Sequence, residues 1–420
     1  MAFSTRHRCL RATLTLAIFL ASFAVPPQSH AQKFKVLHTF HGPDGDSPLG
    51  LVRDKKGNLY GETERGGVYD YGTVFKLDAN GRRIWLHSFF STNGSLPLGG
   101  LLRDAAGNLF GATLYGGGYC STQQSGCGTV FRLDRNGRKE TLLHKFTGGL
   151  DGGDPANVVP VQDSAGDLYA TTNYGGTGCG VVFKVDQNRK ETVLYAFRCG
   201  ADGKYPLSGV IRDSAGNLYG TTEEGGDVSC FNDGCGTVYR VDPKGTETVL
   251  YNFEMGSGGW LPIDSLTMDS AGNLYGTTIA GGSNKQNCGG FGCGTAFKLS
   301  PNSDGSWTET PLYIFCSKKN CADGAMPSGP LLRNQAGVLY GTTGEGGTST
   351  CYGNGCGVVF KLDTNGKETV LHSFTGGKDG FNPGSNLIMD QAGNLYGTTL
   401  QGGGTSCAAG GCGVVFKITP

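Results

Sequence analysis

One short phrase, Gly-Asn-Leu-Tyr-Gly or a close variant of it, occurs seven times in this chain of 420 residues. Successive copies begin 50 to 65 residues apart. A period of this length marks one supersecondary unit, which cannot bury its apolar face alone and must pack against the next copy. The chain is therefore expected to be an array of seven similar units, whose copies of the phrase begin at Gly57, Gly107, Gly166, Gly216, Gly272, Gly337 and Gly393.

Each unit contains four runs that read as strands, most clearly near the C-terminus. The runs 368–374, 387–390, 394–399 and 413–418 are rich in β-branched and aromatic residues and are bounded by Gly, Asp, Asn or Pro. Turns of the type Asp-x-x-Gly favour hairpins, so consecutive strands should be antiparallel neighbours. The mature chain is therefore predicted to be all-β, with the Leu-x-x-Asp run innermost and the Val-Leu-His-x-Phe run outermost.

The two ends of the chain complement each other. The first strand-like run, 33–40, matches the run 368–374, whereas the last unit stops at Ile418 without such a run. In a ring, the N-terminal strand supplies the missing strand of the last unit and leaves only short, protected edges. An open solenoid would need polar capping units, and neither end of the sequence has one. We predict a seven-bladed β-propeller of four-stranded antiparallel blades, formed by residues 32–420 as a single domain and closed by strand 33–40.

The repeated unit reads Leu-x-x-Asp-x-x-Gly-Asn-Leu-Tyr-Gly-Thr-Thr, then Gly-Gly, then Gly-Cys-Gly-Thr-Val-Phe-Lys-Leu-Asp, and finally Gly-x-Glu-Thr-Val-Leu-x-x-Phe. This pattern is similar to the GloVer (Gloeo/Verruco) tandem repeat and covers about the whole mature chain. The resemblance implies an exported bacterial repeat protein, often with one of several alternative C-terminal surface anchors, and it implies no particular activity. No anchor is expected here, because Pro420 directly follows the last repeat strand.

Residues 1–31 read as a cleaved secretory signal. Three arginines precede an apolar stretch over residues 14–25, and a polar stretch follows that ends at Ala31. A transmembrane anchor is the alternative, but the apolar stretch is too short to cross a bilayer comfortably. We therefore expect export to the extracellular space, the cell surface or the periplasm, with no membrane span after cleavage.

The cysteines fit an oxidising destination. Loss of the leader, which carries Cys9, leaves fourteen cysteines, an even number that favours disulfides in an exported chain. Five pairs bracket the loop between the second and third strands of their units. These predicted disulfides are Cys120–Cys127, Cys230–Cys235, Cys288–Cys293, Cys351–Cys356 and Cys407–Cys412.

The third and fifth units depart from this spacing. Cys179 lies just before one strand and Cys199 just after its neighbour, so antiparallel pairing would bring the two within reach of a disulfide. Cys316 and Cys321 are expected to pair locally, although a bond between Cys293 and Cys316 is an alternative. Zinc is the rival explanation, but each pair lies on its own blade and the loops contain no His. No metal and no cofactor is predicted.

The charge of the chain excludes one class of partner. Thirty-five basic and 35 acidic residues are spread evenly and give a net charge of zero. No basic run or stripe favours nucleic acid or an anionic membrane. We expect a monomer without a nucleic-acid partner.

No catalytic residue is predicted. A catalytic group should break the repeat, because seven equivalent copies of a residue are explained by seven equivalent packing or turn roles. The Asp of the Asp-x-x-Gly turn recurs in this way. One outer-strand slot holds either a histidine, such as His38, or a tyrosine, such as Tyr195, and a metal ligand or general base would not be so interchangeable.

The loops carry the remaining candidates. In such a blade, the loop between strands two and three and the loop leading into the next blade emerge on one face, which we call the loop face. Its aromatic residues and Asp-Gly pairs suit contact with carbohydrate or with a protein surface. Turn formation is the simpler role for the Asp-Gly pairs, and calcium binding by them lacks a recognised oxygen-ligand loop. The candidate binding residues are Tyr69, Tyr71, Tyr119, Phe231, Phe291, Tyr352, Asp44, Asp151, Asp202, Asp323 and Asp379.

The sequence thus favours a secreted, non-catalytic binding or cell-surface interaction module, whose partner on the loop face is a glycan or a cell-surface protein. The alternative is an extracellular enzyme that acts on a polysaccharide in the central channel. Carboxylates or His converging there from non-equivalent blades would favour the enzyme. A third reading is a passive envelope component, which failure to bind any glycan or protein would favour.

Overall fold

The structure of the chain is a computed structural model that describes residues 1, 32–120, 125–226, 230, 233–282, 288–348, 351, 353–404, 407 and 410–419. The predicted secretory signal, apart from Met1, lies outside the described residues. Gln32–Pro420 forms one compact unit. Among the residues described, none belongs to a helix with the length and apolar character needed to span a bilayer.

Twenty-eight strands make up seven sheets of four, and two short 3-10 turns, η1 (Cys288–Gly290) and η2 (Lys319–Cys321), lie between strands. Written from the channel outward, blades 1 to 4 are β2 (Asp46–Arg53), β3 (Leu59–Arg65), β4 (Thr73–Leu77) and β5 (Arg83–Ser88); β6 (Leu102–Arg103), β7 (Leu109–Thr113), β8 (Thr129–Leu133) and β9 (Glu140–Lys145); β10 (Val161–Gln162), β11 (Leu168–Thr172), β12 (Val181–Val185) and β13 (Glu191–Ala196); and β14 (Ile211–Arg212), β15 (Leu218–Thr222), β16 (Thr237–Val241) and β17 (Glu247–Asn252). Blades 5 to 7 are β18 (Thr267–Met268), β19 (Leu274–Thr278), β20 (Thr295–Pro301) and β21 (Trp307–Ile314); β22 (Ala325–Arg333), β23 (Leu339–Glu345), β24 (Val358–Leu362) and β25 (Glu368–Ser373); and β26 (Ile388–Met389), β27 (Leu395–Thr399), β28 (Val414–Thr419) and β1 (Lys33–Thr39).

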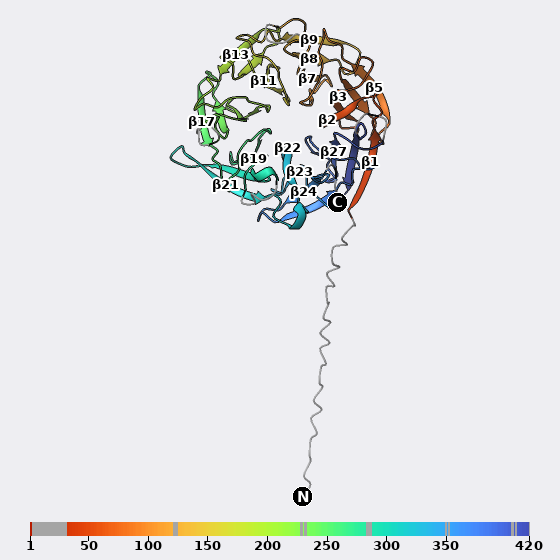
Figure 1. Cartoon of the computed structure of the whole chain (residues 1–420), viewed down its shortest axis with the longest axis vertical. Coiled ribbons are helices and arrows are strands. Elements are labelled where there is room, and N and C mark those ends of the chain that lie inside the picture. Colours follow the sequence, from red (N-terminus) through yellow and green to blue (C-terminus); the bar gives the residue numbers. More distant parts are fainter. Residues whose placement is uncertain are drawn as a thin grey trace. The chain divides into compact units, whose positions relative to one another are not determined.

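The sheets stand around a central channel as a seven-bladed β-propeller, with the first strand of each unit innermost (Figure 1). The ring closes through β1, which pairs antiparallel with β28 in the seventh blade. Lys33 lies opposite Thr419, and Thr39 lies opposite Val414. The predicted fold and its closure by the N-terminal strand are confirmed.

One carboxylate per blade explains why the phrase recurs. In blade 4, Asp213 Oδ1 accepts the backbone N–H of Asn217 at 2.8 Å, while Oδ2 accepts the Asn217 amide at 2.7 Å and the Tyr219 hydroxyl at 3.0 Å. Gly216 lies in the same turn with a φ of 91°, which a residue with a side chain rarely adopts. Asp, Gly, Asn and Tyr therefore recur together because they build one turn, and that turn fixes β14 against β15.

Aromatic pairs join each blade to the next. Phe89, which follows β5, packs edge-to-face on Phe131 of β8, with ring centroids 5.0 Å apart. The contact recurs at every boundary, so the outer strand of one blade is anchored in the core of the next. The seven pairs are Phe40–Phe75, Phe89–Phe131, Phe146–Phe183, Phe197–Tyr239, Phe253–Phe297, Phe315–Phe360 and Phe374–Phe416.

Seven disulfides use all fourteen cysteines that follow the leader. Cys179 and Cys199, at neighbouring ends of β12 and β13, are linked with their Cα atoms 5.3 Å apart. Cys316 is bonded to Cys321 rather than to Cys293. A sulfur in a disulfide is not available as the thiolate ligand that zinc requires.

Candidate functional site

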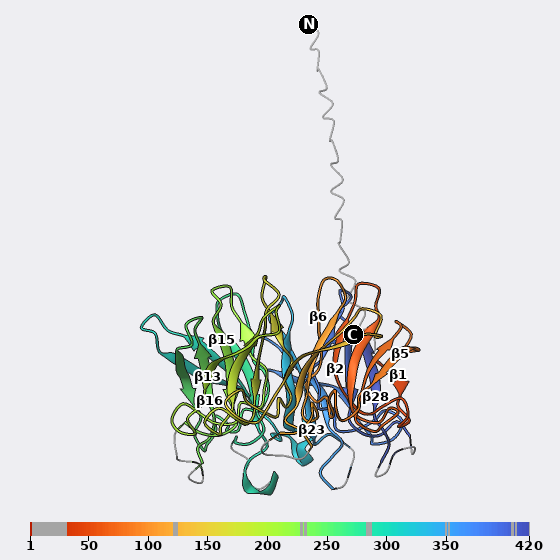
Figure 2. The ribbon, with the colours of Figure 1, turned by 90° about the horizontal axis from the view of Figure 1, so that it is seen from above.

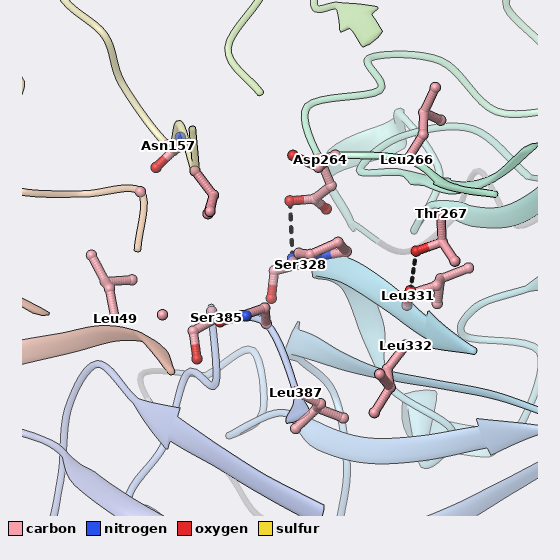
Figure 3. Close-up of a pocket in the computed structure, with 18 of the residues that line it drawn as sticks. Leu49, Asn157, Asp264, Leu266, Thr267, Ser328, Leu331, Leu332, Ser385 and Leu387 are labelled. Atoms are coloured by element: carbon pink, nitrogen blue, oxygen red, sulfur yellow. Dashed lines mark hydrogen bonds between the residues drawn. The ribbon is translucent and has the colours of Figure 1, made fainter. Parts of the chain in front are cut away.

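The inner strands enclose a cavity of about 480 Å³, the channel cavity, to which all seven blades contribute. Figure 3 shows Leu49, Asn157, Asp264 and Ser385 disposed around it, each from a different blade. Most of the wall is apolar. The apolar side chains include Leu49, Leu98, Val159, Ile263 and Leu332.

Asp264 of blade 5 is the acidic group of this lining. Its Oδ2 accepts the hydroxyl of Thr277 at 3.0 Å, and its Oδ1 accepts the backbone N–H of Gly329, in blade 6, at 3.0 Å. Part of the side chain faces the cavity, but protein surrounds it closely. Burial raises the pKa of Asp264 to about 6, although the two hydrogen bonds oppose this shift. Blades 4 and 7 carry Ser208 and Ser385 at this position.

Glu62 is a second carboxyl that departs from the repeat. It stands in β3 where most blades have Thr, as in the Gly-Thr-Thr of β15, and it is 0% exposed. Its Oε2 accepts the backbone N–H of Gly100 in blade 2 at 2.8 Å. Burial raises the pKa of Glu62 to about 8, so the group is mostly neutral near pH 7 and acts as a clamp between blades.

Sequence reasoning missed both carboxyls, although the signal was present. It tested residue types for recognised catalytic patterns and did not align the seven units position by position. That alignment shows Glu62 against Thr and Asp264 against Gly or Ser. The two lie on blades 1 and 5 and bond to different neighbours, so they do not form a pair.

On the loop face, each blade is entered through a residue in the left-handed conformation followed by proline. Tyr205, before Pro206, donates its backbone N–H to the carbonyl of Cys179 in the preceding blade at 3.1 Å. Such a conformation costs roughly 1–2 kcal/mol for a residue with a side chain. We call these seven positions the joint residues; with φ between 52° and 59° they are Ser47, Leu96, Asp154, Tyr205, Leu261, Met326 and Asn382.

The joint residues touch a second variable set, the strand-end residues, which directly follow the second Thr of each Thr-Thr segment or its equivalent. The backbone N–H of Glu223 reaches the carbonyl of Tyr205 at 3.0 Å, and Leu114 bonds Leu96 in the same way at 3.0 Å. Loops from both sides therefore meet on this face, which is the lower edge of the ring in Figure 2. The strand-end residues are Glu64, Leu114, Asn173, Glu223, Ile279, Gly344 and Leu400.

One of these positions opens a hollow. A notch of about 350 Å³ lies between blades 5, 6 and 7, lined by Ile279, Met326, Gly344 and Phe381. Gly344 has an ordinary backbone conformation, so its lack of a side chain is not required by the chain path. The glycine instead leaves space that other blades fill with a side chain, such as Leu400.

The predicted aromatic residues lie on separate blades. Tyr119 is 88% exposed and Tyr69 is 58% exposed, and Tyr71 is also exposed. Tyr69 packs edge-to-face on Phe90, and Phe291 packs on Trp260. Phe231 and Tyr352 lie outside the described residues.

A further exposed aromatic residue was not predicted. Tyr174 and Leu150 of blade 3 flank a hollow of about 410 Å³ whose floor consists of glycines such as Gly149 and Gly175. Both side chains are exposed. An apolar wall above a backbone floor suits contact with the face of a sugar ring or with an apolar side chain.

The predicted Asp residues have internal partners. Asp323 is 0% exposed and accepts the hydroxyl of Tyr313 at 2.7 Å and the backbone N–H of Ser317 at 2.8 Å. Burial opposes ionisation of Asp44, but hydrogen bonds from His38 and from the His41 backbone hold its pKa below its usual value. The same arrangement recurs at Asp151, Asp202 and Asp379.

Solved structures with this fold include an enzyme and two extracellular domains. A catalytically inactive variant of virginiamycin B lyase from Staphylococcus aureus, solved with quinupristin, aligns over 93% of this chain and 99% of that chain, with a TM-score of 0.56 and 12% identity. The extracellular domain of BT4673, described as a one-component system of B. thetaiotaomicron, aligns over 92% of this chain and 40% of that chain, with a TM-score of 0.55 and 11% identity. For BT3049, described as a hybrid two-component system of B. thetaiotaomicron, the shares are 92% and 41%, the TM-score 0.52 and the identity 13%. At these identities the similarity shows the fold alone.

The sequence itself matches one family model. No protein of curated function is similar to the chain in sequence. A model described as the Gloeobacter/Verrucomicrobia repeat matches residues 23–232 and 178–416. The two matches overlap and together span all seven units.

Proposed function

This chain belongs to the Gloeobacter/Verrucomicrobia repeat family, and from that premise we propose that it is an exported, non-catalytic binding module that holds its ligand on the loop face. Export is supported by the leader-like residues 1–31 and by the seven disulfides, which persist in oxidising compartments. The extracellular space, the cell surface or the periplasm is the expected destination.

The observation that carries the proposal is a contrast between adjacent positions. The Thr before each strand-end residue is the same in all seven blades, and its hydroxyl always donates to the carbonyl two residues on, as Thr222 does to Glu224 at 2.9 Å. The Pro after each joint residue is also constant. Equivalent roles thus keep equivalent residues, so the scaffold does not dictate the joint and strand-end residues. Their variety marks the surface on which the blades have been adapted separately.

The chemistry of this surface fits a glycan or a protein of a cell surface. The exposed Tyr119, Tyr174 and Leu150 offer flat apolar contacts, and the disulfides and joint prolines hold the surrounding backbone in place. A rigid surface loses little conformational entropy when a ligand binds. The predicted Asp residues support it from within, because their carboxylates order the loops.

An extracellular enzyme is the second candidate, and Asp264 is the observation that favours it. A hydrolytic site in the channel would need a second acid or base within reach of this carboxyl. Among the described residues that line the cavity, Asp264 is the one acidic side chain and no His accompanies it. The loop face is therefore the better supported site.

The test is a binding screen of the exported, oxidised protein on glycan arrays and on whole bacterial cells, with released sugar measured in the same wells. We expect saturable binding without sugar release. The replacements Tyr119→Ala and Tyr174→Ala should each weaken it, and Gly344→Leu, which fills the notch, should weaken it if the ligand reaches blade 6.

Arg135→Ala is the matched control, because Arg135 is exposed in the β8–β9 turn on the opposite face. Loss of binding in this variant would contradict a loop-face site. Sugar release would establish the enzyme instead, and absence of any binding would leave the protein a passive envelope component.

A further inference from the structure

The channel cavity holds a carboxylate without a counter-charge. Burial and two neutral hydrogen-bond donors account for its pKa shift, and no charged neighbour contributes. Within the described lining of the cavity, from β2 through β26, no Lys, Arg or His accompanies Asp264. A buried carboxylate of this kind is costly, because low-dielectric surroundings disfavour its charged form.

The fold does not need this charge. In blades 4 and 7 the equivalent Ser208 and Ser385 bond the Thr that corresponds to Thr277. A serine in place of Asp264 would make the same contact with Thr277 at no electrostatic cost. What the carboxylate adds is therefore a negative charge, together with lone pairs that its two internal hydrogen bonds leave free.

The rest of the wall limits what can approach this charge. Leu49, Ile263 and Leu332 present apolar surface, and Asn157, at a left-handed position in blade 3, adds one amide. Figure 3 shows Asp264 and Asn157 on different blades that border the same space. A volume of about 480 Å³ lies in the range typical of small-ligand pockets, roughly 300–1,000 Å³.

We propose that the channel cavity is a separate binding site for a small, mainly apolar ligand that carries one ammonium group, with Asp264 as its counter-ion. A cation beside the carboxylate compensates the buried charge, and the apolar walls receive the rest of the ligand. A hydrated metal ion fits less well, since one carboxylate and apolar walls do not replace its oxygen ligands. The site is independent of the ligand on the loop face.

The probes are cyclohexylmethylamine and its neutral isostere cyclohexylmethanol, titrated calorimetrically into the oxidised, exported protein at about pH 8, where the amine is still protonated. We expect the amine to bind about tenfold or more tightly than the alcohol. Asp264→Ser and the isosteric Asp264→Asn should abolish this preference. Ser385→Ala, a change at the same position in blade 7, should preserve it.

Proton linkage provides a second readout that a merely structural role would not change. Binding of the cation favours the ionised carboxylate, so amine binding near pH 6 should release a fraction of a proton, and binding near pH 8 should release almost none. Calorimetry in two buffers of different ionisation heat measures this number. Equal affinity for amine and alcohol, absence of binding at millimolar probe, or an amine preference that survives in Asp264→Asn would overturn the proposal. None of these outcomes depends on a loop-face ligand.

Discussion

Asn386 of blade 7 and Leu51 of blade 1 hold each other through two hydrogen bonds, although 335 residues separate them. The backbone N–H of Leu51 donates to Asn386 Oδ1 at 3.0 Å, and Asn386 Nδ2 donates to the carbonyl of Leu51 at 3.3 Å. Leu51 is 0% exposed. The ring is thus closed on its inner side by one side chain, as it is on its outer side by β1.

Asn386→Ala should weaken this closure. It leaves a buried N–H and a buried carbonyl without partners, which costs about 1–3 kcal/mol of unfolding free energy. Urea unfolding measures the loss. The matched control is Ser265→Ala at the same repeat position in blade 5, where the hydroxyl bonds only Gly209 in the preceding blade. A larger loss in the control than in Asn386→Ala would argue against a special role for the closure contact.

Tyr239→Phe should make the protein more stable. Tyr239 is 0% exposed, and its hydroxyl has no hydrogen-bond partner within the described part of the chain. The other six blades place Phe at this position, and Phe297 makes the same edge-to-face contact. Removing a buried, unsatisfied hydroxyl should gain about 1 kcal/mol, seen as a higher Tm. A lower Tm would show that the hydroxyl has a partner.

Stability should be greatest in mildly acidic solution. Burial raises the pKa of Glu247 and Glu309 to about 7, with Asp202 adding to the shift at Glu247. The folded state thus binds protons more tightly than the unfolded state, so stability is fully present below the unfolded pKa and is lost as pH rises towards about 7. The turn carboxylates act oppositely, because hydrogen bonds hold the pKa of Asp213 below 3.8 against the effect of burial. Their contribution disappears in strong acid, which places the optimum at about pH 5 to 6.

Glu309→Gln tests this pH dependence, because an amide cannot ionise. Since the side chain is partly exposed, we expect the variant to recover on the order of 1 kcal/mol at about pH 8 and little at about pH 5. Thermal melts across this range measure it. Glu254→Gln, at an exposed site in the same sector, is the control. Parallel pH profiles for wild type and Glu309→Gln would refute the prediction.

The disulfide of blade 3 should contribute more stability than the short ones. Cys179–Cys199 spans 20 residues and Cys230–Cys235 spans 5. The loop-entropy model gives about 3 kcal/mol for the first and about 2 kcal/mol for the second. Paired replacements by Ser, compared by urea unfolding, check the order. The reverse order would mean that ordering of the glycine-rich loop outweighs loop length.

The fold could be predicted from the sequence because its information is repeated. Seven copies of the phrase at blade-length intervals and matching ends at 33–40 and 368–374 suffice for a closed ring. Adjacency of two strands was enough to place Cys179 beside Cys199. Both inferences depend on contacts that recur in every unit or lie close in the chain.

The candidate sites could be predicted only in part, because they depend on contacts between blades. Asp323 was taken as a surface candidate from its Asp-Gly pair, but Tyr313 and Ser317 bury its carboxylate. Asp264 went unnoticed because its amide donor, Gly329, lies 65 residues away in the next blade. The left-handed joint residues escaped notice because any residue type can precede proline in the sequence.

The pairing of β1 with β28 has a consequence for biogenesis. Since β1 is the first strand of the described fold to be made and β28 the last, the first strand must wait for almost the entire chain before it finds its partner. During that interval the seventh blade lacks its outer strand, and two unpaired edges are exposed to other chains. A chain that stops within blade 7 can never close. Completion of the last strand therefore acts as the checkpoint that separates a sealed monomer from an adhesive intermediate.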